Sequence, residues 1–192
     1  MRPAGLLLAI SLCAACARDP NDTACPNVRV GELVVSELRG DQSGTGDTIG
    51  QWIELYNASG RQLDISGVTL ELRKIDGGSE ARIVVRVPAL VVDADAYVVL
   101  GAYTGTLPPY ADYGYLSDFS SNLFSAGAIE VAACGTLVDR VVYRDLPVQG
   151  TWAFDGNLAP DATANDDEGA WCADAAGVGF PGTPRERNHP CP

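Results

Sequence analysis

The chain has 192 residues with a formal net charge of −12, and 46% of its residues are apolar. This length suits one domain of ordinary size, and the apolar fraction is large enough for a buried core. So acidic a surface repels nucleic-acid phosphates, which excludes a nucleic-acid-binding protein that works by charge. The single histidine, His189, is fourth from the C-terminal end, which argues against His-based zinc sites and imidazole-dependent catalytic triads. We predict no catalytic residues and no cofactor.

The first sixteen residues have the pattern of an export signal. Arg2 is followed by an apolar run over 5–12, which is shorter than the roughly 20 residues that cross a bilayer. The segment Cys13–Cys16 (CAAC) then resembles a bacterial lipobox, in which small residues precede a cysteine that becomes acylated. The resemblance implies lipidation at Cys16 and a lipoprotein of the cell envelope, with the outer membrane favoured. Cleavage by an ordinary signal peptidase, giving a secreted protein, is the alternative.

Residues 17–27 are polar, contain two prolines and are predicted to be a tether. Residues 28–192 are predicted to form one domain, because short β-rich runs alternate with turn residues and no window keeps a helical period. The predicted strands cover 32–38, 51–56, 63–65, 68–73, 83–87, 97–100, 128–133 and 136–143. This pattern favours an all-β sandwich of two antiparallel sheets, although a closed barrel would look the same. After about residue 145 the pattern fades, and we expect an irregular C-terminal wrap.

Apart from Cys13 and Cys16, the chain has four cysteines: Cys25, Cys134, Cys172 and Cys191. In an exported chain an even number indicates disulfides, and four cysteines allow three connectivities. A four-cysteine zinc site is the alternative, but these four cysteines include no C-x-x-C pair. We predict a Cys172–Cys191 bond, because the glycine- and proline-rich tail cannot hold itself in a sheet. Cys134 lies in a predicted tight hairpin turn with Gly135, and Cys25 is left as its partner by elimination.

Several predicted strands together resemble the lamin-tail domain of bacterial exported proteins. The match begins with the run 51–57 (QWIELYN) and the run 63–70 (LDISGVTL). Further similar pieces occur in the expected order at 33–38, 96–101, 137–143 and, loosely, 181–184. The resemblance implies an immunoglobulin-like sandwich without catalytic residues. Bacterial members of this family resemble adhesion or accessory modules.

Alternation in the second predicted strand places Ile53 and Leu55 on one face and Trp52, Glu54 and Tyr56 on the other. The aliphatic pair is predicted to face the core. The aromatic and acidic face could be an exposed binding surface, because Trp and Tyr dominate interface hot spots. The alternative is that the C-terminal wrap covers this face.

The acidic residues suggest three further sites. Glu37 and Glu54 lie in the first two predicted strands and could form the carboxylate pair of a glycoside hydrolase. The segment 165–169 (NDDEG) could bind calcium, although it lacks the spacing of a known loop. Asp41 with Asp47 is the second calcium candidate, and a solvated turn is the alternative, so we predict no metal site. Asp139 shares a face with apolar residues, so we expect it to be partly buried and hydrogen-bonded in a structural role.

We therefore expect a non-enzymatic structural or protein-binding module, anchored to a membrane through a lipid and contacting another surface protein or a glycan. A calcium-dependent adhesion or glycan-binding module is the first alternative. A glycoside hydrolase is the second.

Overall fold

The structure is a computed structural model that describes residues 25–42, 49–174 and 180–192. The predicted signal peptide, Cys16 and residues 17–24 of the predicted tether lie outside these ranges, as does Asp47. The described residues form strands and two short 3₁₀ turns, η1 (Ala164–Asp166) and η2 (Glu168–Ala170). No helix within these ranges has the length and apolar character needed to cross a membrane.

The largest sheet has six strands. In order across the sheet they are β12 (Trp171–Asp174), β11 (Thr151–Phe154), β1 (Leu33–Arg39), β2 (Trp52–Asn57), β7 (Tyr97–Gly101) and β8 (Tyr113–Gly114). All neighbours are antiparallel except β7 and β8, which run parallel.

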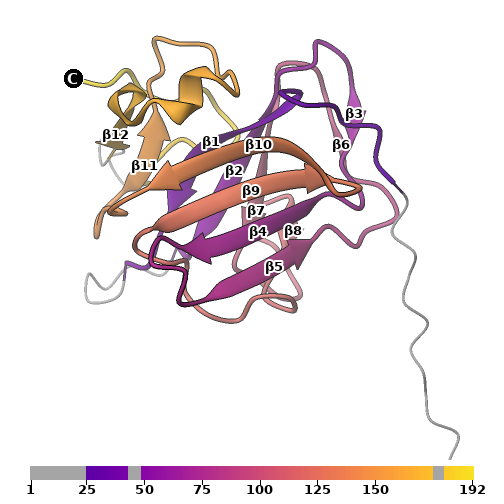
Figure 1. Ribbon diagram of the computed structural model, residues 1–192, viewed down its shortest axis with the longest axis horizontal. Coiled ribbons are helices and arrows are strands. Elements are labelled where there is room, and N and C mark those ends of the chain that lie inside the picture. The colour runs from indigo at the N-terminus through magenta and orange to yellow at the C-terminus, as the bar shows by residue number, and fades with distance from the viewer. Residues whose placement is uncertain (1–24, 43–48, 175–179) are drawn as a thin grey trace, which may run out of the picture.

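A second sheet of four antiparallel strands lies over the first, and its strands are in front in Figure 1. Its order is β10 (Thr136–Tyr143), β9 (Gly127–Ala133), β4 (Thr69–Lys74) and β5 (Glu80–Val84). Two short strands, β3 (Leu63–Asp64) and β6 (Val91–Val92), pair separately. None of these sheets closes on itself, so the prediction of a mostly β fold with antiparallel sheets is confirmed and the barrel alternative is wrong.

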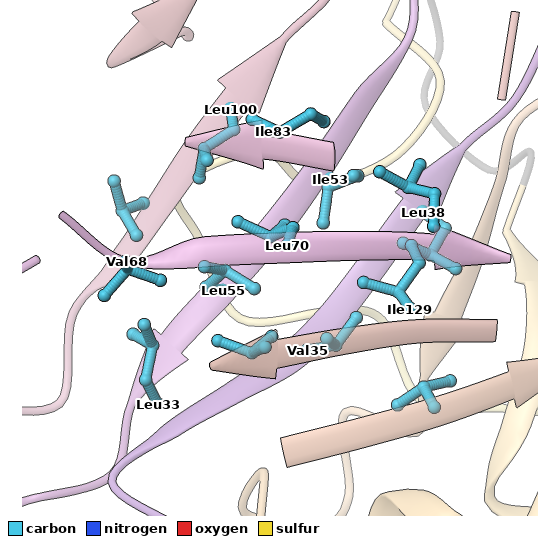
Figure 2. Close-up of a cluster of buried hydrophobic side chains, with 14 of the residues drawn as sticks. Leu33, Val35, Leu38, Ile53, Leu55, Val68, Leu70, Ile83, Leu100 and Ile129 are labelled. Carbon is cyan, nitrogen blue, oxygen red and sulfur yellow. The ribbon is translucent and has the colours of Figure 1, made fainter. Parts of the chain in front are cut away.

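The hydrophobic core lies between the two larger sheets, where aliphatic side chains from both point toward one another (Figure 2). Ile53 and Leu55 of β2 face it, as alternation predicts, and meet Leu70 of β4 and Ile129 of β9. Burying each such side chain contributes roughly 1.5–3 kcal/mol. The apolar alternation along the strands therefore accounts for the stacking of the two sheets.

A bulge in β1 decides which side chains leave this core. The pairing of β1 with β2 shifts between Val35 and Glu37, so that Ser36 is the extra residue. Val35 and Leu38 both pack in the core despite their odd spacing, and Glu37 lies on the opposite, outer face. The bulge therefore brings Glu37 directly across from Glu54.

The turn between β9 and β10 consists of Cys134 and Gly135, with φ angles of 51° and 77°. Two successive positive φ values are what a two-residue type I′ hairpin requires. The predicted tight hairpin is confirmed. Cys134 is bonded to Cys25, which ties the segment before β1 to the hairpin.

The second disulfide joins Cys172 of β12 to Cys191 near the C-terminus. Both pairs are those expected from the sequence, and because all four cysteines are bonded, the zinc alternative is wrong. Disulfides of this kind indicate an extracytoplasmic protein.

The C-terminal part is more regular than predicted. Residues 151–154 and 171–174 form β11 and β12, which extend the six-stranded sheet beside β1. These two strands pair with each other, and Trp152 stacks on Trp171 with ring centroids 4.2 Å apart. These contacts order two segments whose apolar runs are too short to predict strands. Residues 180–192, here called the C-terminal strap, contain no strand, as expected of an irregular wrap.

Candidate functional site

The most unusual chemistry of the molecule is a pair of carboxylates on the outer face of the six-stranded sheet. Glu37 of β1 and Glu54 of β2 are direct partners across the two strands. Both side chains are fully buried, although neither faces the main core. What covers them is the C-terminal strap.

Glu37 accepts hydrogen bonds on both carboxylate oxygens. Its Oε2 accepts from the indole Nε1–H of Trp52 at 2.9 Å. Its Oε1 accepts from the Thr151 hydroxyl at 2.8 Å and from the backbone N–H of Thr183, in the strap, at 3.0 Å. The strap thus uses a backbone donor to dock on this carboxylate.

Glu54 has fewer partners. Its Oε1 lies 2.8 Å from the Ser36 hydroxyl, and its Oε2 accepts from the backbone N–H of Arg185 at 2.6 Å. Two carboxylates in neighbouring strands therefore each hold one backbone amide of the strap, two residues apart. No strand pairing is needed to seat this segment.

Asn188 fixes the second half of the strap. Its side-chain amide donates to the carbonyl oxygens of Ser36 at 2.8 Å and Phe154 at 2.9 Å, and its Oδ1 accepts from the Thr183 hydroxyl at 2.9 Å. At the other end, Phe180 stacks on Trp52 with ring centroids 5.9 Å apart. The strap is therefore held by side chains and buried acceptors along most of its length.

Burial is the main influence on the acidity of the pair. It raises the pKa of Glu37, although the donors from Thr183, Thr151 and Trp52 act in the opposite direction. Burial raises the pKa of Glu54 well above its usual range, and the neighbouring Glu37 carboxylate raises it further. Burial therefore disfavours a negative charge on both residues, and each carboxylate makes a second charge beside it less favourable.

The predicted exposed binding face of Trp52, Glu54 and Tyr56 is wrong for its first two residues. Trp52 and Glu54 are fully buried, and only Tyr56 is half-exposed, where it donates to Asp95 and packs beside Tyr97. The alternative holds: the C-terminal segment covers the face. The same coverage keeps a glycan away from Glu37 and Glu54 in this arrangement, which weighs against the hydrolase alternative.

Asp139 is buried and hydrogen-bonded, as predicted. Its Oδ2 accepts from the backbone N–H of Val35 at 2.8 Å and from the side-chain amide of Asn165 at 2.9 Å. Asp139 therefore joins the two sheets and the η1 turn. Burial raises its pKa to about 6, so the stability it contributes decreases as the pH rises through that value.

Replacing Asp139 by alanine is expected to lower the free energy of unfolding by about 1–3 kcal/mol at about pH 5, below the pKa at which the stability contributed by Asp139 decreases. The Val35 N–H and the Asn165 amide would lose their buried acceptor. Urea unfolding measures the change, with Glu168→Ala as the control, because Glu168 is exposed and only pairs with Arg144 at the surface. A loss below about 0.5 kcal/mol for Asp139→Ala would contradict the structural role.

The side chains of the calcium candidate at 165–169 have other partners, and the second candidate includes Asp47, which lies outside the described residues. Asn165 is buried and bonded to Asp139, Asp167 accepts from the Gly169 N–H, and Glu168 pairs with Arg144. Asp41 accepts a hydrogen bond from Asn122. Across residues 25–42, 49–174 and 180–192, no group of three potential ligand side chains is placed to hold a metal ion.

The outer face of the four-stranded sheet is a candidate binding surface that was not predicted from the sequence. It carries cross-strand ion pairs, Arg140 with Glu130 at 3.5 Å and Arg82 with Glu71 at 3.1 Å. Beside them, a shallow hollow includes Leu137, whose surface is 47% exposed. The alternation of charged residues in these strands is the signal that could have identified this face.

The contacts of the strap residues Thr183, Arg185 and Asn188 with β1 and β2 could not be predicted from the sequence. No local pattern links these residues to strands that lie more than a hundred residues away along the chain. A comparison with protein-family models finds no match for this chain, and a comparison with curated proteins also finds none.

Proposed function

We propose that this protein is a non-enzymatic structural or protein-binding module of the cell envelope, anchored by a lipid at Cys16. Its resemblance to lamin-tail domains favours an immunoglobulin-like sandwich, and the two facing sheets are compatible with that architecture. The two disulfides favour a location outside the cytoplasm.

The observation that carries the proposal is the contrast between the two outer faces. The carboxylates that could do chemistry are sealed beneath the strap. The four-stranded sheet instead presents paired charges and the exposed side chains of Leu137 and Val142. Such a surface suits contact with another protein, because the charges provide register and the aliphatic groups provide buried area.

A photo-crosslinking residue at Leu137, introduced in the cells that make the protein, should capture an envelope protein. Leu158 is a matched control, because it is a leucine of similar exposure that lies near the strap.

Labelling the same cells with a palmitate analogue should mark the wild-type chain but not the Cys16→Ser variant.

An adduct at Leu158 but not at Leu137 would contradict binding through the four-stranded sheet. Equal labelling of the wild type and Cys16→Ser, or labelling of neither, would contradict the lipid anchor and leave a secreted protein.

A further inference from the structure

The hydrogen bonds around the carboxylate pair reveal which of its members can hold a proton. A backbone N–H and an indole N–H can only donate. Glu37 meets one such group on each oxygen, Trp52 Nε1–H on Oε2 and Thr183 N–H on Oε1. A proton on either oxygen of Glu37 would therefore oppose a fixed donor.

Glu54 differs on one oxygen. Its Oε2 faces the N–H of Arg185 and must accept. Its Oε1 faces the hydroxyl of Ser36, which can accept as well as donate. A proton on Glu54 Oε1 can therefore be donated to Ser36 Oγ without opposing an N–H group.

The charges around the pair give little compensation for a second negative charge. Among the ion pairs between described residues, Arg185 is paired with Asp112, and none includes Glu37 or Glu54. His189 lies 2.8 Å from Asp174 and forms an ion pair with it only when the imidazole is protonated. Asp112 and Asp174 themselves add negative potential. Further titratable groups packed around the site are Arg39 of β1, Tyr56 of β2, Tyr97 of β7, Tyr110 between β7 and β8, Asp155 after β11, and Glu186 and Arg187 of the strap.

We propose that Glu54 is protonated on Oε1 at neutral pH while Glu37 is ionised, and that this proton keeps the C-terminal strap closed. Two adjacent carboxylates buried beneath the strap cannot both ionise without a large cost. When the strap lifts, Glu54 meets water and ionises with an ordinary pKa of about 4.3. Strap closure is therefore coupled to proton uptake.

The direction of the pH effect follows from this coupling. The pKa of Glu54 is higher in the closed state, so closure is favoured at low pH and weakens as the pH rises. Between the open-state and closed-state pKa values, the opening equilibrium should rise about tenfold per pH unit. The disulfide at Cys191 keeps the open strap attached to the domain.

Hydrogen–deuterium exchange of the peptide 180–187, corrected for the intrinsic pH dependence of exchange, tests the proposal between about pH 5 and pH 8. In the wild type, the protection should fall about tenfold per pH unit. Glu54→Gln mimics the acid, since its amide NH₂ can donate to Ser36 and its oxygen can accept from Arg185. This variant should keep its protection, with a pH dependence much weaker than that of the wild type.

Glu37→Gln is the matched control. Its NH₂ group would face the N–H of Trp52 or Thr183, so protection of the strap should be lost at every pH. Urea unfolding at each pH separates strap opening from global unfolding, to which Asp139 also contributes. A ¹³C NMR titration of the glutamate carboxyl groups in the wild type gives a readout that needs no variant: one carboxyl should remain protonated at neutral pH.

Equal pH slopes in the wild type and Glu54→Gln would overturn the proposal. So would full protection in Glu37→Gln together with lost protection in Glu54→Gln, because the proton would then be on the other residue. An NMR titration in which every glutamate ionises at its ordinary pKa would also overturn it.

Discussion

Removing the Cys25–Cys134 bond is expected to lower the free energy of unfolding by about 4–5 kcal/mol, the largest effect we predict for a single covalent change. The bond closes a loop with a sequence separation of 109 residues, so it restricts the unfolded chain strongly. The variant should be Cys25→Ser with Cys134→Asn. Asparagine tolerates the positive φ of 51° at position 134 and preserves the type I′ turn with Gly135.

The matched comparison is Cys172→Ser with Cys191→Ser, which opens a loop with a sequence separation of 19 residues. Its expected loss is about 3 kcal/mol, because the entropy of loop closure grows slowly with loop length. Urea unfolding under non-reducing conditions measures both. A larger loss from the short loop would show that seating the strap, and not the freedom of the unfolded chain, governs the effect of these bonds.

Local sequence patterns correctly predicted those structural features that depend on residues close together in the sequence. Alternation assigned Ile53 and Leu55 to the core, and the pair Cys134-Gly135 identified a two-residue hairpin. Asp139 was placed correctly, because an acid on an apolar face must find buried donors. Each of these inferences depends on a few adjacent residues.

The carboxylate site required information that no local pattern contains. Strict alternation from Val35 would point Glu37 into the core, and only the extra residue at Ser36 turns it outward, opposite Glu54. The donors that cover the pair come from Thr183 and Arg185, more than 125 residues along the chain. Because the strap forms no strand, contacts of individual side chains fix its position, and no periodic pattern in the sequence predicts it.

The outer faces of the two sheets differ in how their charged side chains are stabilised. On the four-stranded sheet, charged side chains remain in water and pair across strands, for example Arg73 with Glu80 at 3.0 Å. On the six-stranded sheet, acidic side chains are covered by the chain's own C-terminal segment and need buried donors. Glu37 and Glu54 are therefore acceptors that hold the strap, which explains how an acidic pair can be buried without a neighbouring arginine or lysine in contact.

Replacing Gly156 by alanine is expected to lower the free energy of unfolding by about 2–4 kcal/mol. Gly156 follows β11 and donates its N–H to the carbonyl of His189 at 3.0 Å. A Cβ at this position would lie 1.8 Å from the carbonyl oxygen of Asn188, which is backbone and cannot rotate away. The strap would have to move, and Asn188 would lose its bonds to Ser36 and Phe154.

Gly169→Ala is the matched control for this clash. The nearest atom to its added Cβ is Oδ1 of the Asp167 side chain at 3.2 Å, which can shift, so its effect should stay within about 0.5 kcal/mol. Exchange of the peptide 180–187 should become fast in Gly156→Ala and stay slow in Gly169→Ala at the same pH. Equal stability and equal strap protection in the two variants would mean that the close approach of Gly156 to the strap does not hold it in place. A selective loss of protection would show that the absence of a Cβ at Gly156 lets the strap, which has no secondary structure of its own, pack closely against the end of β11.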